Sequence, residues 1–549
     1  MNFKSIIASA LLLQSASAAL ACTGLIATPG ATADSSALVT YAADSHTLYG
    51  ELYHKPGATH QKGEMRKVVE WDTGKPLGEI PEAPVTYTRI GNMNEHGLAI
   101  TESTWGGRHE LAGSGIIDYG SLIYIALERA RTAPEAIKIM TDLVKDYGYA
   151  SEGESFTIAD PNEVWIMEMI GKGKDDKGAV WVARRVPDGY IAGHANHSRI
   201  HKFPLKDKTK QTIYSPDVIK FARQKGYFDG KDEDFSFSRA YAVYDMGALR
   251  GCDGRVWAFY NRFAPDMDKY LPWVLRGEGE PLPLWVKPTK KLTANDMKWM
   301  MRDHFEGTPM DMTKDVGAGP YKVPYRWRPL TYKVDGSEYT HERAIATQQT
   351  GFSLVAQLNA KAADAMKGIL WFGVDDANTS VYVPMYCCLT EAPLEYRVGN
   401  GDLLTYSDNS AFWMANIVAN QAYNRYSQMI PDIRKVQTQL EDSIEQEVEI
   451  LYREVPYLDA DAARKLLRER SADWSKKCTD KYRELGRYLL VKYLDGNVKK
   501  ENPDGTFART PEGMPVYPEF PGYDERYYRS IVADPDGGER LKVIEVPQK

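Results

Sequence analysis

The sequence predicts an α+β protein in which antiparallel strands are followed by long helices. Short segments rich in aromatic and β-branched residues, separated by turns, recur between residues 22 and 405. This spacing is typical of antiparallel strands. After Ser410 the pattern changes to long stretches with apolar residues at helical spacing and opposite charges four residues apart, which indicates helices with a solvated face.

The first 21 residues have the features of an export signal. Lys4 precedes an apolar stretch, and Ala19 and Ala21 provide the small side chains that signal peptidase requires. Polar residues interrupt the stretch before it reaches the roughly 20 apolar residues of a transmembrane helix. We therefore expect cleavage before Cys22 and an exported protein, either periplasmic or secreted.

A bacterial lipoprotein signal is the competing interpretation of the same junction. In such proteins the first residue after the signal is also a cysteine, and its sulfur carries lipid. Ala19 stands at the position where these signals usually have leucine. The two interpretations exclude each other, because an acylated thiol cannot act as a nucleophile.

The first strands after the junction form an expected hairpin. Residues 24–27 and 37–41 are apolar and are separated by turn residues. This hairpin would hold Cys22 at the end of a sheet. Asp44 follows the second strand and would lie near the start of the first.

Further strands and a helical region follow in order. A second hairpin is expected from residues 85–90 and 98–104, with Gly97 ending its turn. Residues 121–147 are helical in pattern, and Pro134 opens the second half. An antiparallel meander is then expected from four strands, at residues 155–159, 163–169, 179–185 and 190–192.

The second half of the chain changes from loops to strands and then to helices. Residues 202–333 are rich in loops, with one expected helix near residues 293–305. Strand-like sequence resumes at residues 344–347, 352–357, 368–373 and 380–385. Two long helices, at residues 430–452 and 460–494, predict a helical hairpin, and residues 502–549 are expected to form an extended tail around the body.

Composition limits the classes of partner. The formal net charge is -7, and without a basic stripe to neutralise phosphates a nucleic acid is not an expected partner. The chain has five cysteines, an odd number that leaves at least one thiol unpaired within the molecule. A reserved thiol at Cys22 fits this count.

Three histidines close together, His194, His197 and His201, raise the question of a metal site. No helical His-Glu-x-x-His arrangement accompanies them, and we expect neither a metal nor another cofactor. Asn196 lies between them at the end of a strand, where its side-chain amide could donate to a developing oxyanion.

Several motifs, taken together, resemble one family of hydrolases. They occur in the following order: Cys22-Thr23, Asp34-Ser35-Ser36, Asp44-Ser45, residues 93–97, 163–168, 195–200, 305–309, 371–376 and 411–413. This series is similar to the C69 family of dipeptidases, which are N-terminal-nucleophile (Ntn) hydrolases related to penicillin V acylases and bile salt hydrolases. The resemblance implies a four-layer αββα sandwich of two antiparallel sheets.

The resemblance also implies the residues that act in catalysis. Cys22 would be the nucleophile and its own α-amine the general base, because that amine has a reference pKa of about 7.7 to 8.0. Asp44 matches the acidic residue of the family, and Asn196 would bind the oxyanion. Thr104 is a candidate for a second oxyanion contact.

One position departs from the family pattern. Related acylases have an arginine three residues before the acid, where this chain has Tyr41. Arg239 and Arg343 are the candidates to replace that charge and to bind substrate, and no spacing argument chooses between them.

Four parts of the chain follow from these expectations. They are a signal peptide (1–21), a catalytic domain (22–405) with its insertion around 202–333, a helical hairpin packed on that domain (406–500) and the tail (501–549). We expect an exported cysteine-dependent dipeptidase acting on short peptides. An N-acyl amide hydrolase of the same superfamily and a lipid-anchored, non-catalytic binding protein are the alternatives, and the oligomeric state, a homo-oligomer included, stays open.

Overall fold

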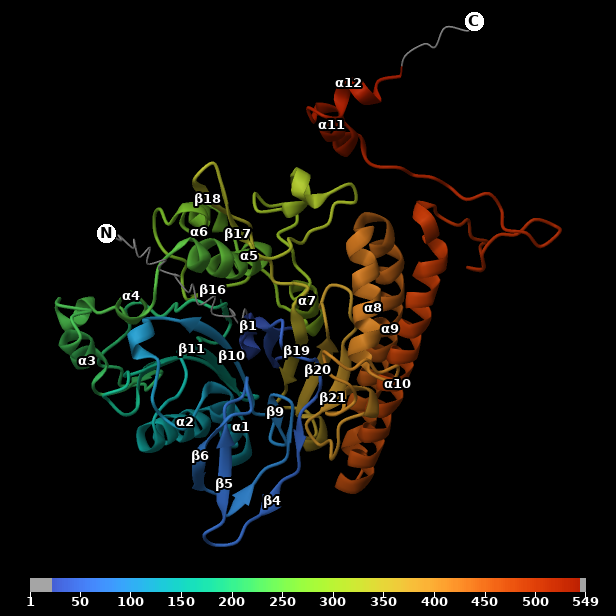
Figure 1. The fold of residues 1–549 in the computed structure, drawn as a ribbon. Coiled ribbons are helices and arrows are strands. Elements are labelled where there is room, and N and C mark those ends of the chain that lie inside the picture. Colours follow the sequence, from blue (N-terminus) through green and yellow to red (C-terminus); the bar gives the residue numbers. More distant parts are fainter. Residues whose placement is uncertain (1–21, 544–549) are drawn as a thin grey trace, which may run out of the picture.

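The computed structural model describes residues 22–543. The predicted export signal therefore lies outside the described residues. Two large antiparallel sheets and a set of helices make up the molecule (Figure 1), so the predicted α+β class is confirmed. No helix in the described part of the chain combines the length and the apolar character that crossing a bilayer requires.

A seven-stranded sheet carries the segment that follows Cys22. Its strands, in spatial order, are β16 (Trp285–Val286), β14 (Ile191–His194), β1 (Gly24–Ala27), β2 (Ala37–Asp44), β19 (Thr350–Leu358), β20 (Gly368–Val374) and β21 (Val383–Tyr386). Ile26 lies opposite Val39, which confirms the first predicted hairpin. β19 then pairs along the whole length of β2, so the N-terminal hairpin lies at the centre of this sheet.

An eight-stranded sheet contains the predicted meander. Its order is β15 (Thr212–Tyr214), β13 (Ala179–Arg185), β12 (Val164–Gly171), β11 (Gly153–Ala159), β10 (Ala99–Gly106), β9 (Met93–Asn94), β8 (Arg89–Ile90) and β3 (His54–Lys55). β10 contacts β1 and β2 of the other sheet, and β11 contacts β2, because both sheets turn apolar side chains toward each other. Cys22, Tyr41 and Glu102 are thereby enclosed between the sheets.

Two predictions about these strands were wrong. The expected strand at residues 85–90 is divided into β7 (Val85–Thr86), which pairs with β4 (Ala58–Thr59), and β8. The expected fourth meander strand, β14, leaves the meander and pairs with β1. Periodicity predicts that a segment is a strand but not which neighbour it chooses.

Helices cover the strands on both sides. α1 (Tyr119–Arg129) and α2 (Ala133–Tyr147) contact β10 to β13. The stretch predicted as one helix is divided into these two, and the second begins beside Pro134, with Thr132 as its cap. Near β19 to β21 lie α7 (Ala294–Met300), α8 (Ala411–Asn424), α9 (Tyr426–Glu454) and α10 (Ala460–Lys492) (Figure 1).

The loop-rich region contains more helix than predicted. Besides α7 it holds α3 (Val218–Gln224), α4 (Phe237–Tyr241), α5 (Gly254–Phe263) and α6 (Leu271–Arg276). α5 packs on β14 and buries Trp257 and Tyr260. These helices are short and tertiary contacts stabilise them, so their sequence signal is weak. The strand expected at residues 344–347 is absent from the described structure.

The C-terminal part has three long helices and an exposed tail. α9 and α10 confirm the two long helices predicted, whereas α8 was missed as a separate element. The tail, with α11 (Glu525–Ala533) and α12 (Gly538–Leu541), does not wrap the body but extends away from it (Figure 1). No residue of α11 or α12 is buried. The remaining strands are small outer hairpins: β5 (Met65–Val69) with β6 (Pro76–Pro81), and β17 (Thr331–Val334) with β18 (Ser337–Thr340).

Glu128, in the last turn of α1, ties three strands to that helix. Its buried carboxylate pairs with Lys55 at 2.6 Å, with Arg89 at 2.8 Å and with Arg66. Although burial acts in the opposite direction, Arg66 and its neighbours lower the pKa of Glu128 to about 2. These contacts fix α1, which carries three side chains of the pocket described below, those of Tyr119, Ile123 and Tyr124.

We expect Glu128→Gln to remove an acid-sensitive part of the stability. Because the folded-state pKa is lowered, the contribution is fully present above the ordinary pKa of about 4.3 and is lost as the pH falls toward 2. The full contribution is about 3 kcal/mol. Urea unfolding of both proteins between pH 3 and pH 7 measures it, and a stability difference that does not change with pH would contradict it.

Candidate active site

Cys22 lies buried at the start of β1, between the two sheets. Thr23 exchanges backbone hydrogen bonds with Ala42 at 3.2 and 3.0 Å, which brings Cys22 beside the C-terminal end of β2. Asp44 is the last residue of β2 and is also fully buried. The predicted proximity of Cys22 and Asp44 is confirmed, because the antiparallel hairpin places the start of one strand against the end of the other.

A cavity of about 170 Å³ opens in front of the Cys22 thiol. This volume is below the roughly 300 Å³ at the lower end of typical ligand pockets, so the cavity suits a short substrate. Its aromatic walls are Tyr41, Tyr53, Trp71, Tyr119, Tyr124 and Phe352. Its carboxylates are Asp44, Asp72 and Glu102, and none of the described residues that line it is Lys, Arg or His.

The thiol contacts a buried carboxylate and a buried phenol. Sγ of Cys22 lies 3.3 Å from Oε1 of Glu102 and 3.8 Å from the Tyr41 hydroxyl, and that hydroxyl donates a hydrogen bond to the same Glu102 oxygen. Burial, followed by the charges of Glu102 and Asp44, raises the pKa of the Cys22 thiol well above its ordinary value. The thiol is therefore protonated in this arrangement.

Glu102 has a carboxyl neighbour on the next strand. Glu154 of β11 lies beside it and is also fully buried. Burial and the charge of Glu102 raise the pKa of Glu154 well above its ordinary value, since two adjacent buried carboxylates cannot both ionise. Glu154 holds the proton, and its Oε2 accepts a hydrogen bond of 2.9 Å from the Thr104 hydroxyl.

Arg343 forms an ion pair with Asp44. Asp44 ends β2, the strand next to the one that follows Cys22. The Arg343 guanidinium donates to Oδ2 of Asp44, while the Thr350 hydroxyl donates to Oδ1 at 2.6 Å. Thr350 is the first residue of β19, and Arg343 lies in the segment that leads into this strand. Of the two arginine candidates, Arg343 is the one that the fold brings next to the acid.

Asn196 is joined to Cys22 through an arginine that the sequence analysis missed. Gly24 lies opposite His194, so Asn196 lies beside Cys22 at the sheet end. Arg255 of α5 donates to the Cys22 carbonyl at 2.7 Å and to Oδ1 of Asn196 at 2.9 Å. The Asn196 amide in turn donates to the Thr104 carbonyl at 2.5 Å.

Comparison with known proteins identifies the family of the chain. The sequence model described as Peptidase family C69 matches residues 47–439. The chain belongs to this peptidase family. As a C69 peptidase it is a peptide-bond hydrolase. The matched region includes Glu102, Asn196 and Arg255, whereas Cys22 and Asp44 precede it.

Curated relatives of this C69 peptidase carry related names. The chain is 25% identical over 392 residues to a probable dipeptidase of Salmonella dublin, covering 67% of this chain and 81% of that protein. It is 24% identical over 396 residues to a probable dipeptidase of Latilactobacillus sakei, covering 69% and 76%. A dipeptidase of Bifidobacterium longum is 21% identical over 447 residues, covering 72% and 76%.

Other side chains singled out in the sequence lie elsewhere in this C69 peptidase. Arg239 is not part of the pocket, and its guanidinium lies 4.0 Å from the centre of the Tyr244 ring. His197 pairs with Asp253 at 3.0 Å, and His201 contacts Ser236. Within residues 22–543, no three His, Cys, Asp or Glu side chains form a group that could hold a metal ion.

His194 has a structural role beside the site. Its ring bridges Ser103 at 2.6 Å and Thr157 at 2.7 Å, and it lies against Gly24, where an added Cβ would approach the ring to 2.8 Å. Burial lowers the pKa of His194 to about 3, so the ring is neutral and links the two sheets. Gly24 allows this close approach.

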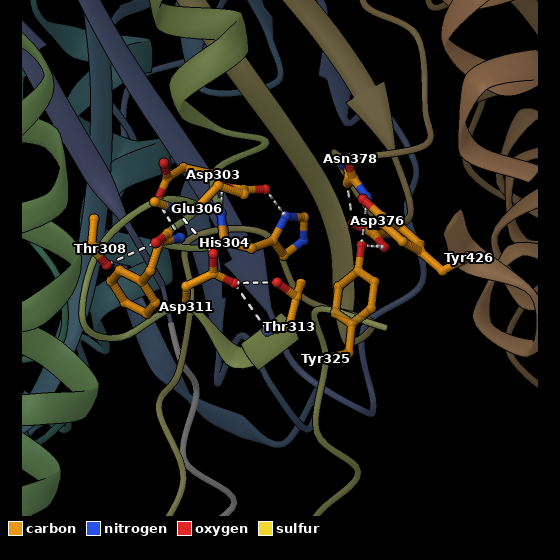
Figure 2. Close-up of polar contacts among 12 residues, drawn as sticks. Asp303, His304, Glu306, Thr308, Asp311, Thr313, Tyr325, Asp376, Asn378 and Tyr426 are labelled. Carbon is orange, nitrogen blue, oxygen red and sulfur yellow. Dashed lines mark hydrogen bonds and ion pairs between the residues drawn. The ribbon is translucent and has the colours of Figure 1, made fainter. Parts of the chain in front are cut away.

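Two further motifs of the C69 resemblance meet in a separate network, shown in Figure 2. His304 contacts Glu306 at 3.0 Å, and its ring lies edge-on to Tyr325. The Tyr325 hydroxyl donates to Asp376, which follows β20. This network fixes the loop after α7 to the end of the sheet that holds Cys22, and none of its residues lines the Cys22 pocket.

Glu102 and Arg255 are the site residues that sequence reasoning missed. Glu102 interrupts an otherwise apolar and hydroxyl-rich strand between Ile100 and Trp105, and a charged residue inside such a strand is the one signal that could have found it. Arg255 lies in a region without a motif. Only the packing of α5 against β14 brings it to Cys22.

Proposed function

We propose that the protein is an exported, cysteine-dependent dipeptidase of the Ntn-hydrolase type. The observation that carries this proposal is the position of Cys22. The residue that signal cleavage would make N-terminal is also the residue whose thiol lies in the pocket. The names of the relatives and the small size of the cavity favour dipeptides as substrates.

The first step is attack by the Cys22 thiol on the scissile carbonyl. After cleavage, the α-amine lies on the same carbon framework as the thiol and can take its proton, a role that a backbone amide cannot fill. The Sγ–C bond forms as the carbonyl π electrons move to oxygen. The resulting oxyanion is tetrahedral and negatively charged.

In this proposal the oxyanion accepts hydrogen bonds from the Asn196 amide and from backbone N–H groups. Because Arg255 donates to the side-chain oxygen of Asn196, the amide nitrogen must face the opposite way, toward Thr104. Removal of one such donor costs about 100- to 1000-fold in rate. The Thr104 hydroxyl bonds Glu154, so we assign Thr104 to positioning Asn196 through its carbonyl.

Collapse of the intermediate completes the reaction. The carbon–nitrogen bond breaks, the leaving amine takes the proton from the Cys22 ammonium, and a thioester remains on Sγ. Water, deprotonated by the same α-amine, then hydrolyses the thioester and regenerates the thiol. Asp44 accepts hydrogen bonds from Arg343 and Thr350. From this fixed place at the end of β2, it would hydrogen-bond the α-ammonium group of Cys22 and orient it.

The fold and the division of the chain belong to this proposal. The two sheets, with helices outside them, fit the four-layer αββα arrangement of Ntn hydrolases, followed by a helical part (406–500) and a tail (501–549). Export would place the enzyme in the periplasm or outside the cell. Short peptides are then its partners. Whether a second copy of the chain also binds stays open.

Two measurements on the purified mature protein test the proposal. Mass spectrometry is expected to find an unmodified Cys22 at the N-terminus, whereas a lipid adduct on its sulfur would favour the binding-protein alternative. Kinetics with a dipeptide panel and with N-acyl amides are expected to show turnover of the dipeptides. Hydrolysis of the N-acyl amides alone would support the acylase alternative.

A further inference from the structure

Glu102 is a buried carboxyl group directly beside the nucleophile. Burial raises its pKa above the ordinary value, while hydrogen bonds from Glu154 and Tyr41 act in the opposite direction and favour its charged form. Glu102 is 1% exposed, lines the Cys22 cavity and approaches Sγ to 3.3 Å. The groups that face the thiol are Tyr41 and Asp44 from β2, Glu102 from β10 and Glu154 from β11. Nothing in the thioester chemistry above uses Glu102.

The charge of Glu102 has no cationic partner in the described part of the chain. Asp44 is paired with Arg343, and Glu154 is neutral. No Lys, Arg or His side chain between residues 22 and 543 forms an ion pair with Glu102. A buried, unpaired carboxylate is costly, so the pocket is suited to a ligand that brings its own positive charge.

A dipeptide places such a charge at this position. In its N-terminal residue, the α-nitrogen is two bonds from the scissile carbonyl carbon, about 2.5 Å away. When Sγ lies about 3 to 3.5 Å from that carbon in a reactive geometry, the α-nitrogen is within hydrogen-bond reach of a carboxylate that touches Sγ.

We propose that Glu102 binds the α-ammonium group of the substrate's N-terminal residue and so restricts the enzyme to peptides with a free N-terminus. This inference rests on the proposed function, because it assumes that Cys22 attacks the first carbonyl. The Tyr41 hydroxyl donates a hydrogen bond to Oε1 of Glu102, the oxygen that contacts Sγ, and so fixes the carboxylate. Tyr41 stands where related acylases have an arginine, so in this chain that position holds the Glu102 carboxylate.

Binding of the ammonium group to Glu102 would also change the ionisation of the Cys22 thiol. While the pocket is empty, the charge of Glu102 disfavours the thiolate. A bound ammonium group neutralises that charge, so the substrate itself favours ionisation of the thiol at the moment of attack. A peptide blocked at its N-terminus neither binds to Glu102 nor relieves this repulsion.

Wild-type mature enzyme provides the first test. We expect kcat/KM for alanyl-alanine to exceed that for its N-acetyl and des-amino analogues by about 1000-fold, the loss typical when a buried charge is left without its partner. Equal values for the three compounds would overturn the inference while leaving the cysteine mechanism intact. Absence of turnover with all three would instead count against the proposed function.

Glu102→Gln provides the second test, with Glu79→Gln at an exposed position of β6 as the matched control. We expect kcat/KM for alanyl-alanine to fall about 100- to 1000-fold and the preference over the N-acetyl analogue to disappear. Glu102→Asp, which keeps the charge, is expected to restore part of the preference. The control changes the same functional group outside the cavity and should keep both values.

Alkylation of Cys22 gives a readout that is independent of turnover. Without the neighbouring charge, the thiol of Glu102→Gln should react with iodoacetamide at pH 7.5 about 10-fold faster than that of the wild type, as followed on the N-terminal peptide by mass spectrometry. Because Cys22 is buried, unfolding would also speed its alkylation, so the comparison is made on a variant whose circular dichroism spectrum and thermal midpoint match those of the wild type. Slower alkylation together with unchanged substrate preference would overturn the inference.

Discussion

Replacing Cys22 with alanine is expected to abolish hydrolysis of dipeptides by the mature protein. Among the described residues that line the pocket, Cys22 is the one cysteine. Without its thiol no thioester can form, and loss of a covalent nucleophile costs about 10⁴-fold or more in kcat. Alanine is small enough for the processing site, so export and cleavage should proceed as before. Steady-state kinetics with alanyl-alanine measure the loss.

The fold of Cys22→Ala should be preserved. The thiol makes one contact with Glu102 and one with Tyr41, and these two residues remain bonded to each other without it. The circular dichroism spectrum and the thermal midpoint are therefore expected to stay close to those of the wild type. Retention of more than a small fraction of the activity by a folded Cys22→Ala protein would exclude Cys22 as the nucleophile.

A protein with one additional glycine before Cys22 is expected to be inactive as well. Its thiol and its pocket are unchanged, but the α-amine of Cys22 has become an amide, which cannot accept a proton near neutral pH. General base catalysis contributes about 10²- to 10⁴-fold, so a loss of that size is expected. Activity with dipeptides, normalised to titrated Cys22 thiol, measures the effect.

The matched control is the same protein with a protease site ending directly before Cys22. It should be inactive as purified and should become active when the protease releases the Cys22 amine. If the extended protein is as active as the mature one, the base is another group. Glu102, which lies 3.3 Å from the thiol, would then be the candidate.

Much of the secondary structure could be predicted because the signals are local. The first hairpin, α1 with α2, and the two long helices α9 and α10 have clear periodicities and caps, and the structure contains them. Cys22 and Asp44 could be placed together because one hairpin connects them. The short helices around Arg255 were missed, because tertiary packing and not their own sequence stabilises them.

The periodicity of the sequence does not predict which distant strands pair with each other. β14 has the sequence of a meander strand but pairs with β1, and this choice carries Asn196 to Cys22. Likewise, the sequence did not distinguish Arg239 from Arg343 as the arginine that replaces the one missing at Tyr41. The pairing of β19 with β2 brings the segment of Arg343 to Asp44, while Arg239 stays on α4.

The sequence by itself therefore determined that the chain is an α+β member of peptidase family C69, with a cysteine at a predicted cleavage site. Only the tertiary structure decided what surrounds that cysteine. The stacking of two sheets places Glu102 against Sγ, and α5 delivers Arg255 to the Cys22 carbonyl. The reason is physical, since burial between sheets fixes contacts and charges among residues that no local pattern connects.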